Sequence, residues 1–237
     1  MSRSADRKTN QLRPIKLTPD YILYPEGSIL IEVGKTKVLC NATIQEEVPA
    51  WIKQQGLNQG WVTAEYGLLP RSTHKRISRE SGSSGSRSQE IKRLIGRALR
   101  ASVDLKQLAP YTCVVDCDVL QADGGTRTAA ITAGYIAMAK AFNQLISANK
   151  LPAAVLIDQI AAVSVGIVDG QSMLDLDYQE DSRATTDLNV VMNARGEYIE
   201  LQGTAEGEPF SQDQLQELLV FARNGIRELM LIQKQYY

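Results

Sequence analysis

The chain has 237 residues, of which 43% are hydrophobic and 22% charged, and 26 basic against 27 acidic side chains give a formal net charge of -1. This composition excludes collagen-like, low-complexity and globally disordered sequence, because the apolar residues suffice to bury a substantial core. The polar N-terminus lacks the apolar run of a secretory signal, and no stretch reaches the roughly 18 uninterrupted apolar residues of a membrane span. We therefore expect a cytoplasmic protein with no membrane association.

Two runs rich in β-branched residues, 28–34 and 36–45, predict a hairpin with its turn at Gly34-Lys35. Gly34-Lys35-Thr36 resembles the end of a Walker A loop, but Ile29 stands where that motif needs its first glycine. A third strand is expected near 60–66. The Ser/Gly/Arg-rich segment 71–87 that follows has no periodicity, which is typical of a functional or a disordered loop.

Residues 90–105 place apolar side chains at helical spacing with basic side chains mostly opposite, which predicts an amphipathic helix capped by Ser86. Residues 112–121 alternate like a strand and lead into a helix from Arg127 so rich in Ala and Gly that close packing on a sheet is expected. Cys40, Cys113 and Cys117 fit neither a zinc knuckle nor a redox pair, so we expect reduced, buried thiols.

Residues 160–203 predict an antiparallel meander interrupted by an acidic loop, and the last helix is expected to begin at a capping box of Ser211 and Gln214. The chain shows no solenoid repeat and no linker between domains. We therefore predict one α+β domain over residues 1–237, with residues 1–12 flexible.

Charge is segregated along the chain. Residues 71–100 carry nine basic against two acidic side chains, a local balance of +7, which favours a surface for a polyanion. Residues 169–187 have a balance of -5, which favours a cation site. A charge run by itself is more often a solvated face, so nucleic-acid binding needs further support.

Two predicted helix starts have an arginine in their first turn. Arg87 follows Ser86 at the first, and Gly124-Gly125-Thr126-Arg127 forms the second. Glycines allow the backbone to approach a ligand, and the free amides of a helix N-terminus carry positive partial charge. Each start could be simple capping, but with a guanidinium each is also suited to phosphate.

The acidic loop offers ligands for a hard metal ion. Asp175 and Asp177 are expected to share a strand face, while Asp181 and Asp187 flank the loop and could converge across it. His74, the only histidine, cannot build a His-based zinc site or a Ser-His-Asp triad. Arginines for phosphate and carboxylates for Mg²⁺ together indicate phosphoryl or nucleotidyl transfer.

The chain resembles the ribonuclease PH family from about Arg13 to near the C-terminus. The resemblance rests on five segments in order: TAEYGLLPRSTHKR (63–76), EIKRLIGRALRASVDL (90–105), DCDVLQADGGTRTAAIT (116–132), EDSRATTDLNVV (180–191) and QGTAEGEPF (202–210). It implies the β-α-β-α ribonuclease PH fold, with mixed sheets packed on helices. It further implies a phosphorolytic 3′-to-5′ exoribonuclease that trims tRNA precursors in a reversible reaction, using inorganic phosphate and releasing nucleoside diphosphates. The implied assembly is a hexamer built as a trimer of dimers.

The resemblance also implies roles for individual residues. Phosphate ligands fall on Arg87, Gly125, Thr126 and Arg127, and Arg127 is implied as a catalytic group together with Asp181 and Asp187. Those two aspartates are implied as Mg²⁺ ligands, one of them alternatively as a general acid. RNA-guiding arginines fall on Arg71, Arg76 and Arg79. Asp116 and Asp118 match the motif, but whether they face the site or pair with arginines stays open at this point.

The chain departs from the family pattern in three places: a shortened loop at 80–86, Ser88 where Thr is frequent, and a small insertion near Leu57-Asn58. The shortened loop affects how Arg87 aligns with the family motif, and it could alter how the protein binds RNA. Two alternatives to a tRNA-trimming phosphorolytic enzyme remain: a non-catalytic RNA-binding subunit of an exosome-like ring, and a metal-dependent hydrolytic nuclease.

Overall fold

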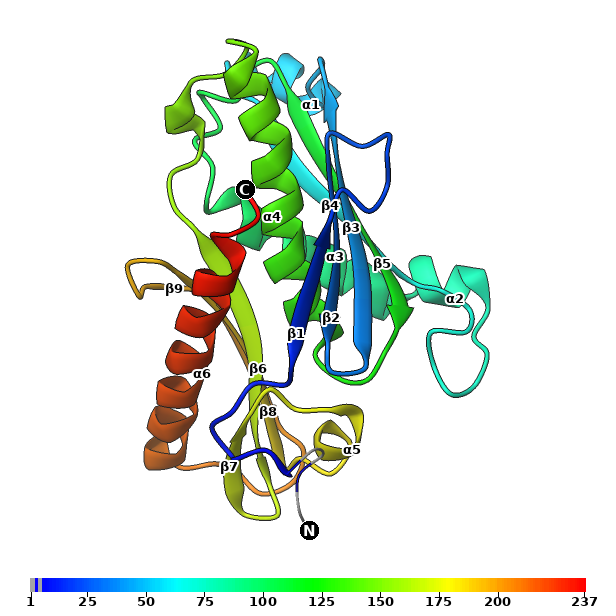
Figure 1. Ribbon diagram of the computed structural model, residues 1–237, viewed down its shortest axis with the longest axis vertical. Coiled ribbons are helices and arrows are strands. Elements are labelled where there is room, and N and C mark those ends of the chain that lie inside the picture. Colours follow the sequence, from blue (N-terminus) through cyan, green and yellow to red (C-terminus); the bar gives the residue numbers. More distant parts are fainter. Residues whose placement is uncertain (1–2, 4–5) are drawn as a thin grey trace.

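Two β-sheets and the helices that pack on them form four layers in the order sheet, helix, sheet, helix (Figure 1). The computed structural model describes residues 3 and 6–237. The predicted α+β class is confirmed. The helices are α1 (Ala50–Gln54), α2 (Arg79–Ser83), α3 (Ser86–Arg100), α4 (Thr126–Ser147), α5 (Tyr178–Asp181) and α6 (Gln212–Gln233).

The first sheet is mixed and has the strand order β1-β2-β3-β5-β4. The predicted hairpin is confirmed, with Gly34 at its turn adopting a φ of +57° that favours glycine. Strand β4 runs parallel to β5, and the other pairs are antiparallel. The strands are β1 (Ile15–Pro19), β2 (Gly27–Val33), β3 (Thr36–Gln45), β4 (Trp61–Leu68) and β5 (Thr112–Gln121).

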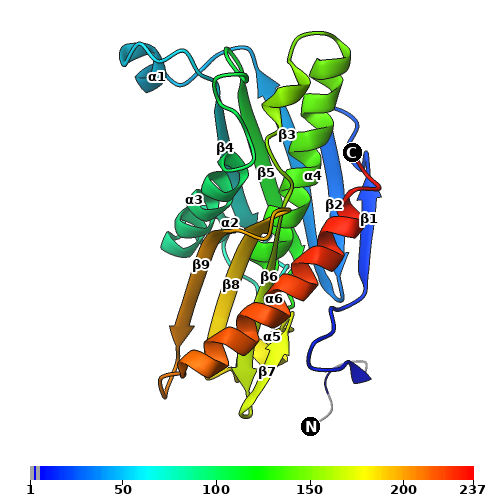
Figure 2. The ribbon, with the colours of Figure 1, turned by 90° about the vertical axis from the view of Figure 1, so that its left-hand side faces the viewer.

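The second sheet is antiparallel and has the order β7-β6-β8-β9. The predicted meander is therefore wrong in its pairing, since β6 lies between β7 and β8. Each residue of β6 is buried, because α4 covers one face of this sheet and α6 the other (Figure 2). The strands are β6 (Ile160–Val168), β7 (Gln171–Leu174), β8 (Thr186–Asn193) and β9 (Tyr198–Ala205).

Helix α4 is the centre of the fold and lies between the two sheets (Figure 2). It is buried almost all round, which its many alanines permit because they let both sheets approach closely. The Thr132 hydroxyl exchanges hydrogen bonds with the backbone of Ala162 at 3.0 and 3.2 Å, which fixes the helix against β6. The N-terminus of α4 is thereby held in one place relative to both sheets.

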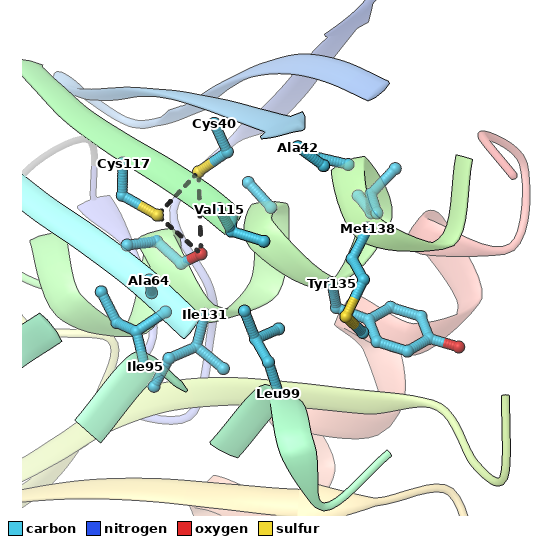
Figure 3. Packing of buried hydrophobic residues seen from close by; sticks show 14 of the residues in the cluster. Cys40, Ala42, Ala64, Ile95, Leu99, Val115, Cys117, Ile131, Tyr135 and Met138 are labelled. Atoms are coloured by element: carbon cyan, nitrogen blue, oxygen red, sulfur yellow. Dashed lines mark hydrogen bonds between the residues drawn. The ribbon is translucent and has the colours of Figure 1, made fainter. Parts of the chain in front are cut away.

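All three thiols are buried and free, as predicted. Figure 3 shows Cys40 of β3 and Cys117 of β5 side by side. Their sulfur atoms lie 3.6 Å apart, and both contact the Ala130 carbonyl of α4. Burial raises the pKa of the Cys113 thiol, and the hydrogen bond with Cys40 together with loss of hydration raises the pKa of Cys117. These thiols are core residues with little nucleophilic character.

Described residues within the segment 1–12 pack against the rest of the protein, and the flexibility predicted for that segment stays a prediction. Arg7 and Leu12 are buried, and the Leu174 amide donates to the Thr9 carbonyl at 2.7 Å. Residues 1–2 and 4–5, which also fall in that prediction, lie outside the described residues. A polar segment can pack in this way when its charged side chains find buried partners.

Two helix starts differ from prediction by one residue. Gly85 caps α3, so Ser86 is the first helical residue and makes no side-chain cap. Gly125 caps α4, and Thr126 rather than Arg127 begins it. The predicted capping box of Ser211 and Gln214 is confirmed in α6. The loop 71–87 also contains α2, which the sequence analysis did not predict.

Candidate functional site

A cavity of about 660 Å³ opens between the two sheets at the N-terminal ends of α3 and α4. It brings together the six residues to which the family resemblance assigns phosphate and Mg²⁺, from four separate elements of the chain. These six are Arg87, Gly125, Thr126, Arg127, Asp181 and Asp187. Residues beyond them that line it include Tyr66, His74, Tyr178, Ser164 and Asn189. That the six selected residues bind phosphate or metal remains a prediction.

The turn before α4 depends on two consecutive glycines. Gly124 and Gly125 have φ angles of +77° and +65°, in the left-handed region that other residues rarely adopt. A Cβ atom on Gly124 would lie 2.5 Å from the Leu176 carbonyl oxygen, and one on Gly125 would lie 2.9 Å from an Arg13 nitrogen. The turn therefore leaves the first amides of α4 uncovered at the cavity, where an anion is favoured.

Arg127 is held at the cavity from two sides. Its guanidinium donates to Gln202 Oε1 of β9 at 2.7 Å and lies 3.6 Å from a carboxylate oxygen of Glu90 on α3. Gln202 in turn donates to Glu90 at 2.7 Å. Arg87 lies in the first turn of α3 and is exposed. The guanidinium of Arg127 is therefore held by protein partners, whereas that of Arg87 faces solvent.

Tyr66 was not selected by the sequence analysis, although it lies within one of the family-like segments. Its ring is buried, and its hydroxyl lies 2.8 Å from the Thr126 hydroxyl, with either atom able to donate. Burial raises the pKa of Tyr66, so the phenol stays protonated at neutral pH. The sequence predicted a strand near 60–66, but it gave no means of finding Thr126 beside Tyr66.

The two carboxylates of the cavity hold their protons more strongly than ordinary aspartates. Loss of hydration raises the pKa of Asp181, the charge of Asp187 raises it further, and Arg87 and Arg127 partly oppose the shift. Loss of hydration also raises the pKa of Asp187, against the charge of Arg127. Two carboxylates in one cavity are suited either to a shared cation or to proton transfer.

We expect Asp181→Asn to raise the melting temperature at pH 7. Because the folded-state pKa is raised, the folded chain binds more protons than the unfolded chain above the ordinary value of 3.8. Stability therefore falls as pH rises through this range, and the loss persists at neutral pH. Thermal unfolding of Asp181→Asn and the parent should give a difference that shrinks toward zero below about pH 4. A lower melting temperature for the variant at pH 7 would contradict the assignment.

The carboxylate pair fits a Mg²⁺ ion that keeps part of its water shell. Among the described residues, no group of three or more His, Cys, Asp or Glu side chains is placed to hold a metal. Mg²⁺ is commonly bound by one or two carboxylates, with waters and substrate phosphates completing the shell. Asp181 and Asp187 supply that number on two facing elements.

Other predicted acidic residues lie elsewhere. Asp175 and Asp177 do not share a strand face, because β7 ends at Leu174; Asp175 pairs with Arg13, and Asp177 caps α5. Asp116 and Asp118 point away from α4 on the outer face of the first sheet. Burial and neighbouring carboxylates raise the pKa of Asp116, which confirms crowding of charge there. None of these four belongs to the described lining of the cavity.

The basic loop borders the cavity, but its three selected arginines do not line it. Thr73, His74, Lys75 and Ile77 contribute to the described wall, whereas Arg71, Arg76 and Arg79 are exposed beside it. The His74 ring lies 5.9 Å from the Tyr178 ring of α5. The three arginines therefore lie outside the described cavity wall, and their role in guiding RNA stays a prediction.

The fold and this cavity place the chain among α+β proteins whose site gathers arginines and carboxylates between two sheets. The sequence matches two models of one family: "3′ exoribonuclease family, domain 1" over residues 11–142 and "domain 2" over residues 158–225. The chain belongs to the 3′ exoribonuclease family of ribonuclease PH. The predicted fold is thus confirmed, and the description of 1–237 as a single domain stays a prediction.

Solved structures with this fold include the following three chains. A chain of "Archaeal exosome core" has a TM-score of 0.77 at 21% identity, covering 98% of this chain and 91% of that one. Rice (Oryza sativa) Rrp46 gives 0.78 at 18%, covering 98% of each. The Archaeoglobus fulgidus exosome with RNA bound to the active site gives 0.78 at 24%, covering 96% and 91%. No helix in the described part of the chain is long and apolar enough to span a membrane.

Proposed function

We propose that this chain is a phosphate-dependent 3′-to-5′ exoribonuclease that shortens RNA and releases nucleoside diphosphates, with tRNA precursors as its substrates. The observation that carries the proposal is the convergence of Arg87, the Gly125–Arg127 turn, Asp181 and Asp187 on one cavity. Anion-binding groups and proton-holding carboxylates in the same cavity are what phosphorolysis requires.

In this reaction an oxygen of inorganic phosphate attacks the phosphorus that links the last nucleotide to the chain. The bond from that phosphorus to the 3′ oxygen of the preceding nucleotide breaks, and the departing nucleotide carries the incoming phosphate as its second phosphoryl group. Arg127, Arg87 and the first amides of α4 would orient phosphate and offset charge on the reacting phosphoryl group. A carboxyl with a raised pKa could give its proton to the leaving 3′ oxygen.

A Mg²⁺ ion held by Asp181 and Asp187 would neutralise phosphoryl charge when bound. Metal binding and proton donation are the two roles that the sequence analysis left open for these residues. The structure supports both on the same ground, since each carboxyl has a raised pKa and lines the cavity. The pH dependence of turnover in Asp181→Asn and Asp187→Asn would assign one role to each aspartate.

For the basic loop we expect Arg76→Ala to weaken RNA binding without changing phosphate use. Its side chain is exposed and outside the cavity, so its contribution should be a contact with an RNA phosphate. Titration of single-stranded RNA at several salt concentrations should give a slope of log K against log salt that is smaller by about 0.7. The exposed Arg223 of α6 serves as the matched control, and an unchanged slope for Arg76→Ala would contradict the role.

A second candidate function is a non-catalytic RNA-binding subunit of an exosome-like ring. The structural relatives favour it more directly than a separate tRNA-trimming enzyme, because two of them are exosome chains and the third is Rrp46. The cavity contains the complete set of predicted phosphate-binding groups and carboxylates, which favours catalysis within such a ring. We therefore propose ring assembly in both cases, with a trimer of dimers as the form expected for this chain alone.

A product assay separates the candidates. The purified chain, its assembly measured by light scattering, is given a 3′-labelled RNA with and without inorganic phosphate. Nucleoside diphosphates formed only with added phosphate would support the proposal. Monophosphates formed without phosphate would indicate a hydrolytic nuclease, and RNA binding without any product would indicate the non-catalytic subunit. A tRNA precursor and an unstructured RNA compared side by side test the substrate.

A further inference from the structure

The buried N-terminal segment contacts both halves of the candidate site. The phosphate half is the glycine turn before α4, and the carboxylate half is α5, which carries Asp181. We call it the N-terminal strap: Arg3 and residues 6–14, the described residues before β1. Figure 1 shows this dark blue segment passing β7 and α5 on its way to β1. Its three arginines, Arg3, Arg7 and Arg13, are each less than a tenth exposed. Buried guanidinium groups are costly unless paired, so their partners indicate what the segment holds in place.

Arg13 holds the glycine turn before α4. Its guanidinium forms an ion pair with Asp175 at 2.7 Å and donates to the carbonyl oxygens of Asp123 at 2.6 Å and Gly124 at 3.4 Å. The backbone amide of Arg13 also donates to Asp175, at 2.8 Å. The guanidinium thus packs against the turn where a Cβ of Gly125 would lie.

Arg3 and Arg7 hold the short helix that carries Asp181. Arg3 donates twice to the Glu180 carboxylate, at 2.7 and 3.0 Å, and Arg7 donates to it at 3.2 Å. Glu180 also accepts from the Asp177 amide, which closes the capping box of α5. Asp181 is the next residue, so the orientation of its carboxyl depends on this buried group.

The two sets of contacts meet at residue 175. Asp175 has a φ of +55°, a conformation that costs energy for a residue other than glycine, and its carboxylate pairs with Arg13. Its carbonyl oxygen accepts from Arg7 at 3.1 Å. The strap therefore fixes a strained point between the phosphate half and the carboxylate half of the site.

We propose that the N-terminal strap sets the geometry of the site through two separable positioning residues. In this proposal Arg13 orients the phosphate-binding turn through Asp123 and Gly124, while Arg7 orients the Asp181 carboxyl through Glu180. This inference rests on the proposed function. Neither arginine belongs to the described lining of the cavity, so each acts through the residues it holds.

The test compares Arg13→Lys with Arg7→Lys. Lysine keeps the positive charge but not the planar fork, so it cannot serve a carboxylate and two carbonyls at once. For Arg13→Lys we expect the KM for phosphate and the calorimetric Kd for inorganic phosphate to rise at least about tenfold, the usual cost of losing an orienting partner, with kcat within threefold of the parent. For Arg7→Lys we expect kcat to fall at least about tenfold, with both phosphate constants within twofold.

Phe142→Leu is the matched control for general destabilisation, because Phe142 is fully buried on α4 outside the described lining of the cavity. If both lysine variants merely lose stability as Phe142→Leu does, with unchanged constants or equal changes in KM and kcat, the inference is overturned. If Arg13→Lys does not fold, Asp175→Asn removes the same ion pair and carries the same expectation.

The parent protein separates this inference from the proposed function. If it binds inorganic phosphate but releases no nucleoside diphosphate, phosphorolysis is wrong, and the calorimetric comparison still decides whether Arg13 orients the turn. If the parent does not bind phosphate in the millimolar range, both the inference and the proposed function are overturned.

Discussion

Arg127→Ala should lower the rate of nucleoside diphosphate release about 10²- to 10³-fold, comparable to the loss of one preorganised charge donor in other enzymes. The effect should be large because Arg127 is held by Gln202 and Glu90 before phosphate arrives, so little reorganisation is needed on binding. Initial rates at saturating RNA and varied phosphate measure it. Both kcat and the KM for phosphate should change, since in the proposed role the guanidinium would contact phosphate before and during the reaction.

Arg97→Ala is the matched control for this prediction. Arg97 also forms an ion pair with a residue of β9, donating to Glu200 at 2.8 Å, but it is outside the described lining of the cavity. Its loss should leave the rate within about threefold of the parent, as expected for an exposed pair worth less than about 1 kcal/mol. Equal rates for Arg127→Ala and the parent would remove Arg127 from the site.

Asp187→Asn should lower turnover by a factor of about 10² to 10⁴, the range that a positioned acid or base supplies. Asparagine has nearly the same shape but neither the charge for Mg²⁺ nor a proton to give. The position on β8, paired with Gly166 and Thr204, should keep the fold intact. Turnover at saturating phosphate and RNA binding by titration are the two measurements, and RNA affinity should stay within about threefold of the parent.

Asp169→Asn controls for the removal of an acidic charge. Asp169 is exposed and pairs with Arg183, away from the described cavity wall. A parent-like rate for this variant and loss of turnover for Asp187→Asn would assign the effect to the site. Loss of both RNA binding and folded structure in Asp187→Asn would instead indicate a structural role for that carboxylate.

Local patterns were enough to find most of the elements that build the site. Alternation and turn residues predict β2, β3 and β5, and apolar spacing predicts α3, because each of these signals acts over a few neighbouring residues. The helix starts are placed one residue too late, since glycines at 85 and 125 cap them without any side-chain signal. Short helices such as α2 and α5 have too few turns for a periodic pattern.

The acidic residues show where local reasoning ends. Asp175 and Asp181 come from the same acidic run, yet one is buried against Arg13 and the other lines the cavity. The period-two expectation for Asp175 and Asp177 assumes that the strand continues, whereas β7 stops at Leu174 and a residue with positive φ follows. The position of Asp175 depends on its ion pair with Arg13, which is distant in sequence, so a local sequence pattern cannot predict it.

The sequence by itself determined the family, the candidate phosphate and carboxylate residues and the charge of the basic loop, because motifs and composition are properties of the chain. Tertiary structure decided that β6 lies between β7 and β8, that Tyr66 meets Thr126, and that the N-terminal strap is buried beneath the site. These are contacts between residues distant in sequence, and burial favours them, because a buried charge or hydroxyl without a partner costs free energy.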